Sequence, residues 1–239
     1  MNALILDTET NKLSGYPIEI AHISCSFEQG VLQIESNSAF DEYFSCPEPI
    51  ELGAMAVHHI LESDIADKPS YEVFRLPENT EYLIGHNIDY DLKAIKLCDP
   101  SISVKGICTL ALARMVWDEL ETHNLTAMYY HVMSADLEKA RKHLRNAHNA
   151  RWDIYFTGVV LQAIVEKLAI KDMNSLYQMS EIARIPKRIT FGKHKGAKVE
   201  KVLESEPGYF SWIQNADFPL YTKKVLTAIK LRKLNNKLT

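Results

Sequence analysis

Ala3-Leu4-Ile5-Leu6-Asp7-Thr8-Glu9-Thr10 joins four apolar residues to a run of acidic and hydroxyl side chains. Four consecutive apolar residues indicate a strand that is buried on both faces, as in the middle of an α/β sheet. The acids follow at the carboxyl end of this strand, which is where such sheets place their functional sites. Because residues i and i+2 of an extended chain point the same way, we expect Asp7 and Glu9 to face one site.

Further strands are predicted on the carboxyl side of this stretch. Ile18–Phe27 and Val31–Ile34 are apolar runs separated by Glu28-Gln29-Gly30, which is typical of a hairpin turn. Tyr82–Ile84 and Val104–Cys108 are predicted to be the fourth and fifth strands, and helical patterns follow them. Strands that alternate with helices after an opening meander indicate an α/β fold with a mixed sheet.

The clearest helix is predicted at Asn149–Leu168, where apolar residues recur at spacings of three and four. Asp153 lies on its apolar face, and a carboxylate placed there requires a partner because an unpaired buried charge is costly. Shorter helices are predicted at Ala54–Leu61 and near Leu110–Trp117, and residues 171–185 are interpreted as a connecting segment.

Charge is distributed unevenly along the 239 residues. Residues 186–239 contain twelve Lys and Arg against four Asp and Glu, a net charge of +8, and include a predicted basic helix at Tyr221–Leu234. Residues 1–185 contain the remaining 15 basic and 27 acidic residues, a net charge of −12. We therefore expect a domain at 1–170 and a small basic C-terminal domain at 186–239, of which the second holds a polyanion and the first concentrates cations.

Several classes of protein are disfavoured by the composition. The chain is 46% hydrophobic and 24% charged, as in ordinary globular proteins. No stretch approaches the roughly eighteen apolar residues of a membrane span, so no membrane partner is expected. The start of the chain lacks the basic region of a signal peptide. The four cysteines form no CxxC pair and are interpreted as reduced thiols of a cytoplasmic protein: Cys25, Cys46, Cys98 and Cys108.

Taken one at a time, the polar candidates also have ordinary structural explanations. Two carboxylates held together at Asp7 and Glu9 favour a divalent cation, but a D-x-E sequence also occurs in solvated turns. Asp91 can simply favour the dipole at the start of a helix. His148 precedes Asp153 by five residues, and a single histidine at such a place is usually structural or exposed.

Taken together, the candidates resemble a known family. D-T-E-T at 7–10, H-N-x-x-Y-D at 86–91 and H-x4-D at 148–153 are similar, in this order, to the three exonuclease motifs of the DEDDh superfamily. Its members include the polymerase proofreading subunit, RNase T and oligoribonuclease. The resemblance covers residues 1–170 and implies an RNase H-like fold with a mixed five-stranded sheet flanked by helices.

The resemblance also implies a chemistry and its residues. Two divalent ions, Mg²⁺ or Mn²⁺, would activate a water and stabilise the charge that develops when a phosphodiester is cleaved. A histidine would remove the proton of the water, and mononucleotides would leave from 3′ ends. By resemblance, the metal ligands are four acids and the base is the histidine: Asp7, Glu9, Asp91, Asp153 and His148.

Substrate contacts are expected around these catalytic groups and in the C-terminal part. Leu13 is expected to pack against the terminal base, although it can instead belong to the core. Residues 54–60 resemble the A-x-x-x-H-G-I stretch of the superfamily, with His59 in place of glycine, which puts the local loop conformation in doubt. The full set of expected contacts is Thr8, Leu13, His58, Asn87, Lys193 and Lys195.

The C-terminal part extends the resemblance to a DNA-directed subfamily through F-G-K-x-K-G at 191–196 and P-G-Y-x-x-W at 207–212. Lysines 193, 195 and 198 are expected to contact a DNA backbone, or else to form a solvated basic face around a small aromatic core. The expected partner is therefore DNA with single-stranded or duplex 3′ ends, in repair or end processing.

Three other functions remain open at this point. An exoribonuclease or oligoribonuclease would use the same motifs. A nucleic-acid-binding protein without activity would be expected to have lost at least one of the motif residues, and all are present. An aspartate-phosphatase-type hydrolase would use Asp7 as a nucleophile and would form a phosphoaspartate.

Overall fold

The protein is described by a computed structural model that covers residues 2–184, 189 and 192–215. The chain divides into two units, residues 1–180 and residues 181–239, and each is described by itself. The predicted basic helix at Tyr221–Leu234 and the aromatic residue Phe191 lie outside the described residues. The predicted domain boundaries stay a prediction.

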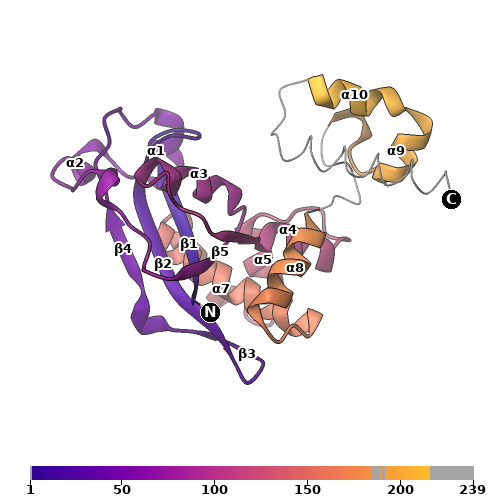
Figure 1. Cartoon of the computed structure of the whole chain (residues 1–239), viewed down its shortest axis with the longest axis horizontal. Helices are drawn as coiled ribbons and strands as arrows, with labels where there is room; N and C mark the ends of the chain where they lie inside the picture. Colours follow the sequence, from indigo (N-terminus) through magenta and orange to yellow (C-terminus); the bar gives the residue numbers. More distant parts are fainter. Residues whose placement is uncertain (1, 185–188, 190–191, 216–239) are drawn as a thin grey trace. The chain divides into compact units, whose positions relative to one another are not determined.

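The first unit is built on one mixed sheet, shown in indigo to magenta in Figure 1. Among the described residues its strands follow the order β3-β2-β1-β5-β6, and a short sixth strand, β4, also pairs with β2. The five predicted strands are thus all present. The strands are β1 (Asn2–Thr10), β2 (Pro17–Glu28), β3 (Val31–Ile34), β4 (Phe40–Tyr43), β5 (Thr80–Gly85) and β6 (Lys105–Cys108).

The pairing of β1 creates an open edge at the middle of the sheet. β1 pairs antiparallel with β2 from Ala3 to Thr10, but its parallel pairing with β5 ends at Ile5. From Asp7 onward, therefore, one edge of β1 is paired with β2, whereas the other edge is not paired with β5. The prediction that Asp7 and Glu9 follow the strand was wrong, because pairing with β2 extends the strand through both acids.

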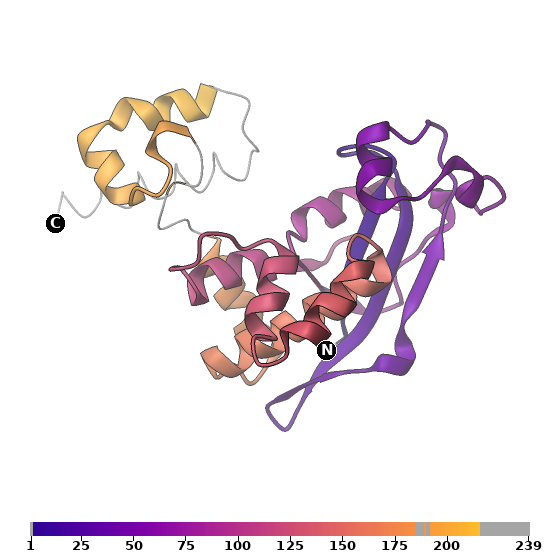
Figure 2. The same cartoon turned by 180° about the vertical axis from the view of Figure 1, so that it is seen from behind.

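Helices cover the sheet, and α7 lies across one face of it (Figures 1 and 2). Gly158 of α7 permits a close approach, since a Cβ atom there would lie 2.9 Å from Ile34 Cδ1 and 3.5 Å from Ile5 Cδ1. The helices of this unit are α1 (Leu52–His58), α2 (Glu62–Ile65), α3 (Asp89–Cys98), α4 (Thr109–Val116), α5 (Leu125–Val132), α6 (Leu137–His143), α7 (Ala150–Leu168) and α8 (Met173–Ala183), the last of which runs past residue 180.

Residues 173–183, interpreted from the sequence as a connecting segment, form helix α8 instead. The helix buries Met173 and Leu176, and the hydroxyl of Ser180 accepts a hydrogen bond of 2.9 Å from the backbone N–H of Cys108. A residue at the end of β6 thus ties α8 to the sheet.

The described part of the second unit has a small core of its own, formed by α9 (Val199–Ser205), α10 (Pro207–Asn215) and the turn that precedes them. The turn requires two positive φ angles, +63° at Gly192 and +85° at Gly196. The core residues are Ile189, Val199, Val202, Leu203, Tyr209, Phe210 and Ile213. In neither described unit is a helix long and apolar enough to cross a membrane.

Candidate active site

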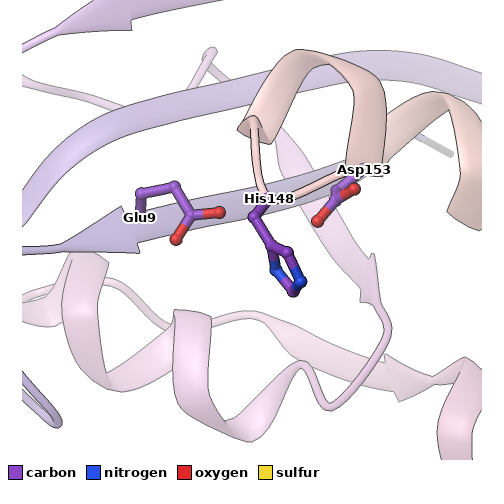
Figure 3. A group of neighbouring side chains, drawn as sticks. All are labelled: Glu9, His148 and Asp153. Atoms are coloured by element: carbon purple, nitrogen blue, oxygen red, sulfur yellow. The ribbon is translucent and has the colours of Figure 1, made fainter. Parts of the chain in front are cut away.

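Two of the three sequence motifs meet at the amino-terminal end of α7. One ligand atom each from Glu9, His148 and Asp153 lies within 4.8 Å of the other two. In Figure 3 the Glu9 side chain extends from its strand towards the histidine ring and the Asp153 carboxylate at the start of the helix. Asp153 is buried, Glu9 is partly buried and His148 is exposed. Solvent therefore reaches the site from the histidine side.

The third motif joins the site through Thr8. The backbone N–H of Thr8 and its hydroxyl both donate to Asp91 Oδ1, at 3.0 Å and 2.8 Å. This N–H lies beyond the last residue of β1 that pairs with β5. The carboxylate of Asp91 therefore accepts a hydrogen bond from a backbone donor that has no partner in the neighbouring strand. Thr8 thus positions Asp91, and its predicted contact with substrate stays a prediction.

The carboxyl groups of the site oppose one another's ionisation. Burial raises the pKa of Asp7 well above its usual range, and the charges of Asp91, Asp153 and Glu9 raise it further. Burial, followed by the Asp153 charge, raises the pKa of Glu9 to about 9. Burial also raises the pKa values of Asp91 and Asp153 to about 7 each. Four acids that would be charged in water are therefore held where charge is unfavourable unless a cation is present.

Further features of the site fit a divalent cation. The Asp153 Oδ1 atom is buried and has no hydrogen-bond partner among the described residues. A buried carboxylate oxygen without a donor is costly, and a metal ion would satisfy it. The donor set is mainly carboxylate oxygen, which suits Mg²⁺ or Mn²⁺ better than softer metals. The residues that would hold such an ion are the four acids Asp7, Glu9, Asp91 and Asp153.

The backbone at His148 sets where α7 begins. His148 has a φ of +65°, and the N-cap residue Asn149 then accepts a hydrogen bond from the N–H of Trp152 at 3.4 Å. The N–H of His148 donates to the Asp153 carboxylate, which lowers the pKa of Asp153 and partly offsets the effect of burial. This tight turn brings the histidine back towards the acid that follows it by five residues.

Glu19 is a fifth acid near the site and is buried, and the sequence interpretation missed it. It lies on β2 directly opposite Glu9, is only 1% exposed, and has a pKa raised by burial to about 7. Its position inside the apolar run Pro17–Glu28 is the sequence feature that could have revealed it, since a charged residue in a buried strand needs partners.

Leu13 lies outside the core, at the tip of a tightly held loop. It is 84% exposed, which removes the alternative that it packs in the interior. The loop is held by Asn11, which is fully buried, accepts from the N–H of Tyr16 at 2.8 Å and donates to the carbonyl of Pro49 at 3.0 Å. An exposed leucine on a fixed loop is suited to pack against a base.

The end of α1 has a histidine, His59, in a backbone conformation that glycine usually adopts. His59 has a φ of +60° and caps α1, so the replacement of glycine is accommodated in the left-handed conformation. His58 is buried, and its Nδ1 accepts from the N–H of Ile60 at 3.0 Å, which leaves the ring proton on Nε2. Asn87 is exposed and also left-handed, with a φ of +83°, in the turn that precedes Asp91.

The predicted lysine contacts in the second unit differ from each other. The ammonium group of Lys193 is paired with Glu206 at 2.5 Å, and it lies 5.8 Å from the ring centre of Tyr209. Lys195 and Lys198 are exposed, and Lys198 is the N-cap residue of α9. Lys193 is therefore partly engaged within the unit, while the other two lysines face solvent.

The sheet order, the acids on its central strand and the helix that carries the last acid agree with an RNase H-like fold, and the chain is similar to known nucleases. The chain is 29% identical to Exodeoxyribonuclease 10 of Escherichia coli K12 over 215 residues, which are 88% of this chain and 90% of the relative. The protein of the same name from E. coli O6:H1 matches equally. Residues 189–217 match the family of exodeoxyribonuclease X-like C-terminal domains.

A solved structure gives the same result for the fold. Exonuclease X in complex with 5′ overhanging duplex DNA is 28% identical and superposes with a TM-score of 0.58, over 76% of this chain and 99% of the other. The resemblance predicted from the motifs is thus confirmed as a resemblance to exodeoxyribonuclease X, and the predicted mixed sheet flanked by helices is confirmed.

Proposed function

We propose that this protein is a metal-dependent 3′-to-5′ exonuclease that releases 5′-mononucleotides from DNA, in repair or end processing. The observation that carries the proposal is the meeting of all three motifs at the open edge of β1. The printed names of its relatives, an exodeoxyribonuclease and an exonuclease in complex with DNA, support DNA as the substrate. All four cysteines are free, which fits the proposed cytoplasmic location.

In the proposed mechanism, the four acids Asp7, Glu9, Asp91 and Asp153 would hold two divalent ions. When bound, the ions supply positive charge for the attacking and leaving oxygens of the phosphodiester. His148 accepts the proton of the attacking water, a task for which an exposed imidazole beside the carboxylates is suited. Leu13 and His58 hold the terminal nucleotide, and Asn87 contacts the substrate or orients the turn before Asp91.

The test of this proposal is Mg²⁺-dependent digestion of DNA labelled at its 3′ or its 5′ end. Early release of the 3′ label as a mononucleotide is the expected result. Early release of the 5′ label would contradict the polarity. Matched single-stranded DNA, duplex DNA and RNA substrates test the substrate class, and a preference for RNA would make the protein an exoribonuclease.

We expect His148→Ala to lower kcat by about 10²- to 10⁴-fold, because the variant retains its acids but loses the proton acceptor. Metal-dependent thermal stabilisation should persist in this variant if His148 is a base and not a ligand. His131→Gln is the matched control, since His131 lies on α5 against Trp117, away from the acids. Loss of metal stabilisation in His148→Ala would instead make the histidine a metal ligand.

We also expect charge reversal at the two exposed lysines, Lys195→Glu with Lys198→Glu, to weaken binding to long DNA. The slope of log K against log salt should fall by about 2, because each phosphate contact contributes about 0.9. Hydrolysis of a dinucleotide or trinucleotide should stay nearly unchanged. The control is the same charge change at Lys68 and Lys96, which are exposed in the first unit. Equal loss on long and short substrates would contradict a role in holding the strand.

A further inference from the structure

Glu19 makes two hydrogen bonds to the start of α7, across more than a hundred residues of sequence. Its Oε1 accepts from the side-chain amide of Asn149 at 2.7 Å, and its Oε2 accepts from the backbone N–H of Ala150 at 3.1 Å. Both oxygens of Glu19 are thus directed at protein donors, and Glu19 is not a member of the group formed by Glu9, His148 and Asp153.

The two donors lie at a sensitive point of the helix. The first N–H groups of a helix have no partner within the helix, and Glu19 satisfies that of Ala150, the first residue of α7. Asn149 is the residue between this helix and His148, and its own oxygen caps the N–H of Trp152. The contact therefore fixes both the strained turn at His148 and the first turn of α7, in which Asp153 lies.

We propose that Glu19 is a positioning residue, which holds the amino-terminal end of α7 so that His148 and Asp153 face Glu9. Since Glu19 and Glu9 are opposite each other on β2 and β1, one strand pair carries both the acid of the site and the anchor of the helix that completes it. The inference rests on the proposed function for its kinetic test. Groups that orient catalytic or metal-binding residues commonly affect rate or affinity by about 10- to 100-fold.

The kinetic test compares Glu19→Ala with Glu19→Gln in the full chain. Glu19→Ala should lower kcat for DNA hydrolysis by about 10- to 100-fold with little change in KM, because the helix start loses its acceptor. Glu19→Gln should recover part of the rate, since its single oxygen still accepts one of the two hydrogen bonds from the helix start. Mn²⁺ affinity of Glu19→Gln, measured by electron paramagnetic resonance, should stay within about twofold of that of the wild type.

A readout that needs no activity separates this proposal from the proposed function. The ring signals of His148 in NMR spectra of histidine-labelled protein should shift or broaden in Glu19→Ala and move part of the way back in Glu19→Gln. If the wild-type protein does not digest DNA, the proposed function fails, whereas the histidine signals still test Glu19. If Glu19→Ala does not fold, Asn149→Ser keeps an oxygen that can cap the N–H of Trp152 but lacks the amide that donates to Glu19, and it should move the same signals.

The opposite results would overturn the proposal. A Glu19→Gln variant as inactive as Glu19→Ala, with weakened Mn²⁺ binding, would mean that the charge of Glu19 acts on the metal directly. Unchanged His148 signals in a folded Glu19→Ala variant would mean that Glu19 does not position the histidine.

Discussion

Asp153→Asn should nearly abolish nucleotide release and, at the same time, raise the melting temperature of the metal-free protein at about pH 8. The loss of rate should be at least about a thousandfold, because a metal ligand supports several kcal/mol of transition-state stabilisation. The gain in stability has a different cause. Asp153 is buried, its pKa is about 7, and at pH 8 the folded protein must carry its charge beside other acids. Asparagine removes that charge.

The two effects are measured on one preparation, by digestion of 3′-labelled DNA with Mg²⁺ and by thermal unfolding with a chelator. Glu166→Gln is the matched control, since Glu166 lies on the same helix but is exposed and should alter neither quantity. A variant that keeps more than about a tenth of the rate would remove Asp153 from the ligand set. A lower melting temperature would show that its carboxylate stabilises the metal-free fold.

Removing the metal should abolish activity, and adding it should stabilise the protein more at high pH than at low pH. The folded-state pKa values are raised from 3.8 to about 7 for Asp91 and Asp153, and from 4.5 to about 9 for Glu9. A carboxyl group with a raised pKa contributes stability below its unfolded value, and this contribution is lost as pH rises towards the folded value. The metal-free protein should therefore lose stability from about pH 4 upward.

Metal binding reverses this trend, because the ion binds the ionised acids and only the folded protein offers them together. The shift in melting temperature caused by Mg²⁺ or Mn²⁺ should be several degrees larger at about pH 8 than at about pH 5.5. Asp153→Asn serves as the control with a damaged site and should show a reduced shift. A shift of the same size at both pH values would contradict binding by these acids.

The sequence was sufficient to predict elements whose pattern is local. The apolar run before Asp7 and the periodic apolar residues of α7 are strong signals of secondary structure, because each keeps one spacing between apolar residues. The three motifs were recognisable for a similar reason, since the types and the order of their residues can be read from the sequence without knowing which residues are in contact. The resemblance and the mixed sheet were accordingly confirmed.

What the sequence could not predict depends on partners that are distant along the chain. The strand β4 exists because it pairs with β2, and helix α8 is held through Ser180 by a residue of β6. Glu19 has no motif, and its role becomes visible only when Asn149 and Ala150 lie beside it. The end of β1 was misplaced for the same reason, since its length is set by β2.

Gly158 affects how closely helix α7 approaches the sheet, and therefore how far apart the acids of the candidate site lie. It lies five residues beyond Asp153 on the same rigid helix, about 7.5 Å along its axis. A larger side chain there would meet the Cδ1 atoms of Ile34 and Ile5, so either these side chains or the helix would have to shift. The distance between the proposed metal ligands on β1 and α7 therefore depends in part on the contact of Gly158 with these apolar side chains. We therefore expect a substitution at Gly158 to change the rate of hydrolysis, although no polar residue of the site is replaced.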